Sequence, residues 1–249
     1  MRIELRNVRK RFGRMEALRG LDLDLPAGTR AALVGPNGSG KSTLIRALLG
    51  LLACEGEVRL DGRSPFEDRL LTARRLAYVP QTAPQLSASV EEVIHTVAFT
   101  RGLSPEAIGG VAARLDLDLA PIRARPFRNL SGGMKQKLLI AAAFAARSEE
   151  HTSELQSLRH LAAAFAARPA LLVLDEPTAS LDARARERFH ALCAELPAGT
   201  TLLLCSHRFE EIRHLADHVI ALEDGRVTWD GPARDFLPLR PRAQEVARG

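Results

Sequence analysis

Apolar and polar residues alternate in some segments of the chain and run together in others. Residues 3–6 and 21–25 alternate with a period of two, which predicts half-buried antiparallel strands. Residues 56–80 also favour strands. Three further segments are short continuous apolar runs, the pattern of strands that a parallel sheet buries on both faces, at residues 30–34, 171–174 and 201–205.

Other segments favour helices. A helix is predicted over residues 42–52, and apolar residues at spacings of three and four predict helical structure from 90 to about 118. Strands that alternate with helices indicate an α/β fold with a mostly parallel central sheet, which the helical block interrupts. We therefore predict a discontinuous core domain at residues 1–82 and 129–231. A helical subdomain is inserted at residues 83–128, and residues 232–249 form a poorly packed, proline-containing tail.

The composition is that of an ordinary soluble protein. The 249 residues are 46% hydrophobic and 26% charged, and no apolar run reaches the roughly 18 residues needed to cross a bilayer. The N-terminus lacks the apolar core of a signal peptide, so we expect a cytosolic protein. Three well-separated cysteines have no metal-site spacing and are expected to be free buried thiols, namely Cys54, Cys193 and Cys205.

The net charge of +5 raises the possibility of a nucleic-acid partner. The basic residues are scattered arginines, with four lysines in all and no run of five or six charges. Aromatic residues make up 4% of the chain, too few for a platform on which bases stack. Nucleic acid is therefore not expected as a partner.

A glycine-rich loop follows the apolar run at 30–34 and precedes the helix predicted at 42–52. Its sequence matches the P-loop pattern GxxxxGK[ST] in full. Glycines let backbone N–H groups turn toward phosphate, and the helix N-terminus adds partial positive charge. The lysine reaches the β- and γ-phosphates and the following serine binds Mg²⁺. The expected nucleotide-binding residues are Gly35, Asn37, Gly38, Ser39, Gly40, Lys41, Ser42 and Thr43.

Two carboxylates end the apolar run at 171–174. Asp175 and Glu176 would lie at the carboxyl edge of a parallel sheet, where such sheets bind ligands. Asp175 is expected to hold Mg²⁺, directly or through water, and Glu176 to polarise the attacking water.

The segment Leu130–Gln136, LSGGMKQ, resembles the signature motif of ABC-type ATPases. Together with the P-loop it is close to diagnostic, and the resemblance covers about residues 1–235. It implies a P-loop NTPase (RecA-like) core with an antiparallel β subdomain and an inserted helical subdomain. It also implies ATP and Mg²⁺ as cofactors.

The resemblance assigns roles to further residues. Phe12 takes the place of an aromatic that stacks on adenine, although a core aromatic is the alternative. Gln81 matches the loop glutamine that senses Mg²⁺ and the attacking water. Asp182 lies in a segment that matches the loop at the dimer interface, and His207 matches the histidine that contacts the γ-phosphate.

The family mechanism implies two copies of the ATPase. ATP on Lys41 of one copy would be capped by Ser131, Gly132 and Gly133 of the other, in a homodimer or a pair of ATPase subunits. Hydrolysis at Glu176 would reopen the pair. We expect a separate integral-membrane permease and a location on the inner face of the cell membrane.

A repeat interrupts this pattern. Residues 141–147, AAAFAAR, recur 21 residues later at 162–168. Ser131 and Asp175 are 44 residues apart in this chain. Removing 21 residues leaves 23, which is the separation that the resemblance leads us to expect. Residues 147–157 also resemble the translation of a sequencing-adapter oligonucleotide. We interpret Ser148–Arg168 as an artefactual insertion that loops out; a genuine surface loop is the alternative.

These features predict the ATP-hydrolysing motor of a membrane transporter. A non-transport ABC ATPase, or a binding-only protein inactivated by the insertion, are the alternatives. Residues 130–136 and 205–208 resemble subunits of ABC-2-type exporters and of a copper-handling transporter, but the sequence identifies no cargo.

Overall fold

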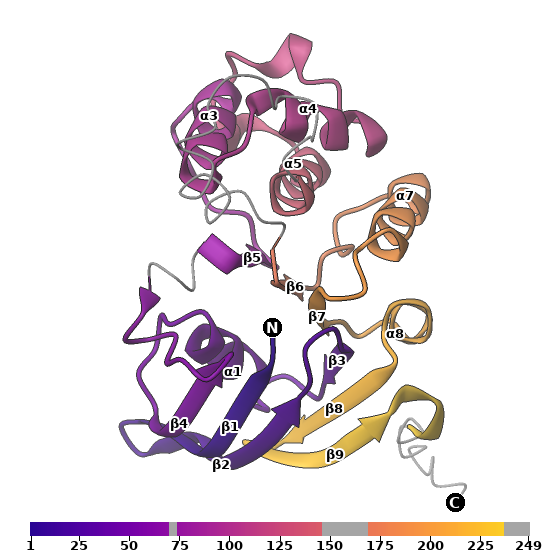
Figure 1. Ribbon diagram of the computed structural model, residues 1–249. Coiled ribbons are helices and arrows are strands. Elements are labelled where there is room, and N and C mark those ends of the chain that lie inside the picture. Colours follow the sequence, from indigo (N-terminus) through magenta and orange to yellow (C-terminus); the bar gives the residue numbers. More distant parts are fainter. Residues whose placement is uncertain (70–73, 146–168, 237–249) are drawn as a thin grey trace, which may run out of the picture.

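The computed structural model describes residues 1–69, 74–145 and 169–236 (Figure 1). One antiparallel sheet has the order β2-β1-β4 and is formed by β1 (Ile3–Phe12), β2 (Met15–Leu25) and β4 (Glu55–Leu60). The second sheet has the order β5-β6-β7-β3-β8-β9. Its strands are β3 (Arg30–Val34), β5 (Leu76–Val79), β6 (Leu171–Asp175), β7 (Thr201–Cys205), β8 (His218–Glu223) and β9 (Arg226–Pro232).

All neighbouring strands of the second sheet are parallel except β8 and β9. This confirms the predicted α/β fold with a mostly parallel sheet. Alternate residues of β6 and β7 join two different cores. Leu172 and Leu204 pack toward the helices, whereas Val173 and Leu203 pack toward α1 (Lys41–Leu48) and the antiparallel sheet. Burial on both faces explains why these strands are continuous apolar runs.

Helices α3 (Val90–Arg101), α4 (Pro105–Arg114) and α5 (Gly132–Phe144) gather at one end of the molecule, with the antiparallel sheet and α1 at the other (Figure 1). Helices α7 (Ala183–Ala194) and α8 (Phe209–Leu215) follow β6 and β7. Three short 3-10 helices complete the described elements, at Ala120–Ile122, Phe127–Asn129 and Ala233–Asp235.

The helical block is two helices, where the sequence predicted one helical stretch. Ser89 and Glu92 form a capping box at the start of α3. Gly102, at φ +64°, ends that helix, and Ser104 caps α4. Helix α1 also ends earlier than predicted, at Leu48. A Cβ on Gly50 would lie 2.1 Å from the Pro65 carbonyl oxygen, so the chain turns there through a glycine.

The packed structure extends further along the C-terminal segment than the prediction of a loose tail from residue 232. Pro232 ends β9, and the Ala233 N–H donates to the Asp217 carbonyl at 2.9 Å. The Phe236 ring lies edge-on to Trp229, with centroids 6.0 Å apart. Residues 237–249 lie outside the described residues.

Residues 141–144 of the first repeat copy form the end of α5. Phe144 packs edge-on against Phe189, with ring centroids 6.0 Å apart. The half-buried Arg101 guanidinium donates to the carbonyls of Ala142 and Ala143, which lie in the last turn of the helix. The proposed insertion Ser148–Arg168 and the second copy lie outside the described residues. Within the described ranges, no helix has the length and apolar character needed to cross a membrane.

Thr201 joins the antiparallel sheet to the central one. Its hydroxyl donates to the Met1 carbonyl at 2.6 Å and accepts from the Gly28 N–H at 2.9 Å, in a buried position. We expect Thr201→Val to lower the free energy of unfolding by about 1–3 kcal/mol, because both backbone groups lose their partner. Urea denaturation measures the effect. Thr200→Val is the control, since no hydrogen bond of its hydroxyl occurs among the described residues; equal losses in both variants would contradict the prediction.

Candidate nucleotide-binding site

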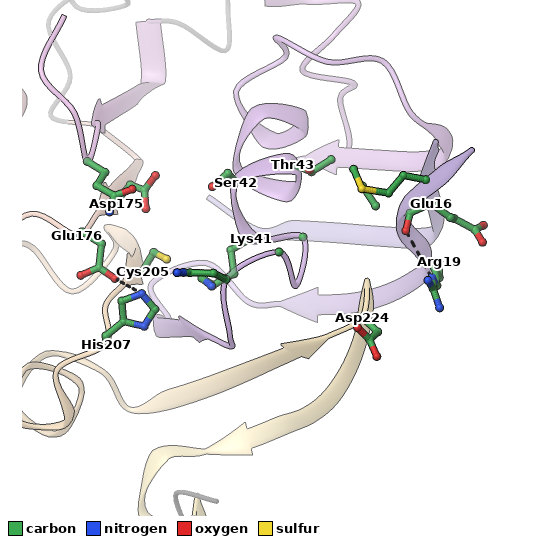
Figure 2. A pocket seen from close by; sticks show the side chains of 16 residues that line it. Glu16, Arg19, Lys41, Ser42, Thr43, Asp175, Glu176, Cys205, His207 and Asp224 are labelled. Atoms are coloured by element: carbon green, nitrogen blue, oxygen red, sulfur yellow. Dashed lines mark hydrogen bonds and ion pairs between the residues drawn. The ribbon is translucent and has the colours of Figure 1, made fainter. Parts of the chain in front are cut away.

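A cleft of about 390 Å³ opens where four neighbouring strands of the parallel sheet end (Figure 2). The loop after β3 becomes α1, and the loops after β5, β6 and β7 approach from the same edge. Because the carboxyl ends of parallel strands share one edge, residues far apart in the chain meet here. The lining residues are Met15, Glu16, Ala17, Arg19, Asn37, Gly38, Gly40, Lys41, Ser42, Thr43, Gln81, Asp175, Glu176, Cys205, His207 and Asp224.

The loop before α1 depends on its glycines. Gly35 has φ +148° and Gly40 has φ +106°. A Cβ on Gly35 would lie 2.1 Å from the Leu222 carbonyl oxygen, and one on Gly40 would lie 2.7 Å from that of Ala17. The loop is thus pressed against β8 and β2, which leaves no room for a side chain at either position.

Lys41 starts α1 and points back over the loop. Its ammonium donates to the carbonyls of Gly35 and Pro36, at 2.6 and 2.9 Å. The charge therefore lies inside the curve of the loop, in front of the helix N-terminus. A phosphate placed there would meet the lysine and the helix dipole together.

Asp175 is the last residue of β6 and lies opposite Cys205 of β7. Burial raises the pKa of its carboxyl above the ordinary value, while contacts with Cys205, Lys41 and Tyr78 act in the opposite direction. Burial and Asp175 raise the pKa of Tyr78 to about 12. Asp175 is a buried carboxylate at the wall of the cleft, so a bound cation would stabilise its charged form.

Glu176 follows with left-handed backbone, at φ +49°. Its N–H donates to the Cys205 carbonyl at 2.8 Å, and this fixes the turn after β6 against the end of β7. The Glu176 Oε1 atom lies 3.2 Å from Nε2 of His207. The glutamate side chain is 11% exposed and the histidine 54%, so the pair reaches from the protein interior to the open cleft (Figure 2).

Ser42, Gln81 and Asp175 all line the cleft. A hydroxyl, an amide and a single carboxylate are oxygen donors that suit Mg²⁺, which binds one or two carboxylates together with phosphate and water. Thr43, Asn37 and Gly38 also line the cleft, and the Ser39 hydroxyl is buried beneath the loop.

Phe12 does not line the cleft. It ends β1 in a hairpin opposite Met15, which does line it, and the Lys10 ammonium lies 5.4 Å from its ring centroid. Phe12 is 43% exposed, which contradicts the alternative that it is a core aromatic. Its ring is available at the edge of the site.

The signature residues lie elsewhere on the chain. Ser131 caps α5, accepting from the Met134 N–H at 3.2 Å, and Ser131 and Gly132 are exposed. A Cβ on Gly133 would lie 2.9 Å from the Ser180 carbonyl oxygen. None of the three signature residues lines the cleft of its own chain.

Asp182 lies beside the signature helix and is also outside the cleft. It caps α7 by accepting from the Ala185 N–H at 2.8 Å, and this hydrogen bond holds its pKa below the ordinary range. Lys137 of α5 approaches it to 3.8 Å. The helix that carries the signature and the loop after Glu176 are therefore in contact.

Sequence reasoning missed Glu16, Arg19, Cys205 and Asp224. The Asp224–Gly225 turn between two strands is a recognisable hairpin signal. Its position beside the phosphate loop depends on hydrogen bonds between distant segments. The Gly225 N–H donates to the Ser39 carbonyl, and its own carbonyl accepts from Arg19 N–H at 2.8 Å.

Burial makes the charged form of the Glu176 carboxyl energetically unfavourable. Burial raises its pKa above the ordinary 4.5, despite the opposing attraction of His207. The ionised group therefore destabilises the folded state at pH values above the raised pKa. This cost disappears as the pH falls to about 4.5, where the unfolded chain also becomes protonated.

We expect Glu176→Gln to melt at a higher temperature than the wild type at neutral pH. The difference should shrink as the pH falls through the raised pKa, because the wild-type carboxyl then becomes neutral as well. Thermal melts across this range measure it. Glu210→Gln, at an exposed glutamate, is the control. A wild type as stable as Glu176→Gln at neutral pH would show that burial of this charge has no cost.

The chain resembles one family of known proteins in both sequence and structure. Residues 18–149 match the family model described as ABC transporter. The chain is 34% identical to the nickel import ATP-binding protein NikO of Rhodobacter capsulatus, covering 94% of this chain and 90% of the relative. It is 33% identical to the Nod factor export ATP-binding protein I of Cupriavidus metallidurans, covering 94% and 72%.

A solved structure described as the ATP binding subunit of an ABC transporter superposes with a TM-score of 0.76 at 25% identity, covering 94% of this chain and 91% of that one. A dimeric structure of the ATP-binding cassette MJ0796, bound to ADP and Pi, has a TM-score of 0.73 at 24% identity and covers 94% and 100%, which supports the fold. The predicted P-loop NTPase fold is confirmed. With a P-loop, a strand ending in Asp175–Glu176 and a signature sequence on one such fold, the chain belongs to the ABC transporter ATP-binding subunits.

Proposed function

We propose that the chain hydrolyses ATP in this cleft and works as two copies that close on the nucleotide to drive a separate permease. The observation that carries the proposal is the meeting of Lys41, Glu176 and His207 around one cleft, from the start of α1 and from the loops after β6 and β7. Lys41 supplies positive charge for the phosphates, and the Glu176–His207 pair supplies proton-accepting groups beside them.

In this proposal Glu176 orients a water molecule for attack on the γ-phosphorus. The new P–O bond forms as the bond to ADP breaks, and the carboxylate polarises the water as it attacks. His207 contacts the γ-phosphate from the open side of the cleft. The raised pKa of Glu176 suits a base, since it brings proton affinity closer to neutral pH.

Ser42, Asp175 and Gln81 would hold Mg²⁺. The ion would neutralise charge on the β- and γ-phosphates. Burial of Asp175 supports this role, because a raised pKa means that the protein alone stabilises its negative charge poorly.

The exposure of Ser131 and Gly132 supports a paired arrangement. Ser131 starts α5, so its neighbouring N–H groups present a helix N-terminus to whatever approaches from outside. A second copy, facing the first, would bring this surface over the γ-phosphate held by Lys41. MJ0796 is described as a dimeric cassette, which supports the same pairing here.

A membrane permease would complete the transporter, and the ATPase would lie on the cytoplasmic side of the membrane. The relatives are named as import and export subunits, for nickel, hemin, sulfonates and Nod factors. This range leaves cargo and direction open. It also does not favour a non-transport ATPase.

We further propose that Ser148–Arg168 is an insertion without a role in catalysis. The family match ends at residue 149, close to the start of that segment. The start of the first repeat copy, residues 141–144, ends α5, and Phe144 packs on Phe189.

The first test is ATP turnover by the purified chain, as it stands and with Ser148–Arg168 deleted. Glu176→Gln serves as the blank for each form, because it removes the base while keeping the shape. We expect the deletion form to hydrolyse ATP well above its blank. The rate of the full chain relative to it measures how far the insertion impairs the motor.

Equal rates in the two forms would identify the segment as a tolerated loop. ATP binding without turnover in the full chain alone would make that chain a binding-only protein. If neither form exceeds its blank, even with a permease present, the proposed function is wrong.

A mixing experiment tests the paired site. Glu176→Gln disables the cleft of its own copy, and Ser131→Arg blocks the surface offered to the partner. Each variant alone should be inactive. Mixed, they form some dimers with one intact composite site, so part of the wild-type rate should return. A site built within one chain would gain nothing from mixing.

A further inference from the structure

Glu211 on α8 is a buried carboxylate that none of the roles above uses. Its side chain is 3% exposed. One oxygen accepts from the Ser206 hydroxyl at 2.8 Å, and the other accepts from the Thr178 hydroxyl. The Arg208 guanidinium, which is 45% exposed, approaches to 3.8 Å.

The two hydroxyls belong to the two loops that carry the reactive pair. Thr178 lies two residues after Glu176, in a turn where the Ala179 N–H donates to the Glu176 carbonyl at 3.2 Å. Ser206 directly precedes His207, and its hydroxyl accepts from the Arg208 N–H at 3.1 Å. The carboxylate of Glu211 therefore links the two loops from behind (both hydroxyl residues are buried).

Stability alone does not account for a charge in this position. Burial of a carboxylate is unfavourable unless hydrogen bonds compensate, and three apolar residues at positions 178, 206 and 211 would fill the same space with no buried polar group. A carboxylate can accept from two hydroxyls at once, and charge-assisted bonds are short and directional. The Glu211 carboxylate therefore fixes the distance between the two loops.

The backbone does not fix that distance by itself. The Glu176 N–H bond to the Cys205 carbonyl joins the ends of β6 and β7. Beyond it the loops diverge, one toward the cap of α7 at Asp182 and the other toward α8. Besides the direct contact of Glu176 with His207, the Glu211 side chain spans the two loops after the point of divergence.

We propose that Glu211 is a positioning residue, which holds the loop after Glu176 and the loop of His207 in the one arrangement that keeps their side chains 3.2 Å apart. This inference rests on the proposed roles of Glu176 and His207. Through Thr178 it also connects the His207 loop to the segment leading to Asp182, since the Leu181 N–H donates to the Thr178 carbonyl at 3.0 Å.

The test compares Glu211→Ala and Glu211→Gln with Glu210→Ala in the full chain. Glu210 is the preceding residue, exposed and of equal charge, so it is a matched control. We expect Glu211→Ala to lower kcat roughly tenfold or more, with KM for ATP changed less than about threefold, because alignment is lost and nucleotide contacts are not. Glu211→Gln should recover most of kcat, since its amide can accept from one hydroxyl and donate to the other.

A purely structural role predicts a different result. Glu211→Ala would then lower the melting temperature while the folded fraction kept the kcat of Glu210→Ala, and the proposal would be overturned. A kcat for Glu211→Gln as low as that of Glu211→Ala would overturn it as well, because the bonding geometry would not be what matters.

Thr178→Val and Thr178→Ser extend the test if Glu211→Ala fails to fold. Valine keeps the shape and removes the hydroxyl, whereas serine keeps the hydroxyl. We expect valine to lower kcat and serine to retain it; equal rates would contradict the proposal. Thr178→Val should change kcat by a different factor in the Glu211→Gln background than in the wild type, because the two residues act as one unit.

The His207 ring signal in NMR spectra separates this inference from the proposed function. If the wild type does not exceed its Glu176→Gln blank, the proposed function fails, and the ring signal still reports position. Glu211→Ala should shift that signal and Glu210→Ala should not. An unmoved signal in Glu211→Ala would show that Glu211 does not position His207.

Discussion

The parallel alignment of β5, β6, β7 and β3 is the constraint on which the rest of the molecule depends. Because these neighbours run in one direction, the loops that leave them meet at one edge. The reactive side chains therefore lie at the ends of the strands or within the first residues after them. Asp175 is the last residue of its strand, and His207 lies two residues beyond β7. The two-sided hydrophobic core thus also determines where the chemistry is placed.

That placement brings charge close to the apolar core. Burial raises the pKa of both Asp175 and Glu176, so the protein holds two carboxylates in conditions that oppose their ionisation. Glu211 is a third buried acid a short distance away, but it is satisfied by hydroxyls. The two reactive acids face the open cleft, where a bound cation can compensate their negative charge. Glu211, whose charge is stabilised by hydrogen bonds within the protein, serves the scaffold. Asp175 and Glu176, whose charges are not stabilised in this way, are the reactive acids.

Much of this was predictable from local pattern. The continuous apolar runs identified β3, β6 and β7, and the spacing of Gly35, Gly40 and Lys41 identified the phosphate loop. The break at Gly102 was missed because apolar periodicity continues across it, while the left-handed turn depends on one residue. The cleft residues Glu16, Arg19 and Asp224 were missed for another reason. They reach the site only through the contacts of β2 and β8 with the phosphate loop, which no local pattern encodes. The signature residues were recognised by resemblance, and they do not line the cleft of their own chain.

The lysine of the phosphate loop carries a consequence for affinity. Lys41 already donates to two backbone carbonyls of its own loop, those of Gly35 and Pro36. An ammonium has three N–H donors, so one remains for a phosphate while the other two stay on the loop. The two carbonyls thus hold the Lys41 side chain in place before any ligand arrives. A phosphate that binds there costs less side-chain freedom than it would cost if it had to order a mobile lysine.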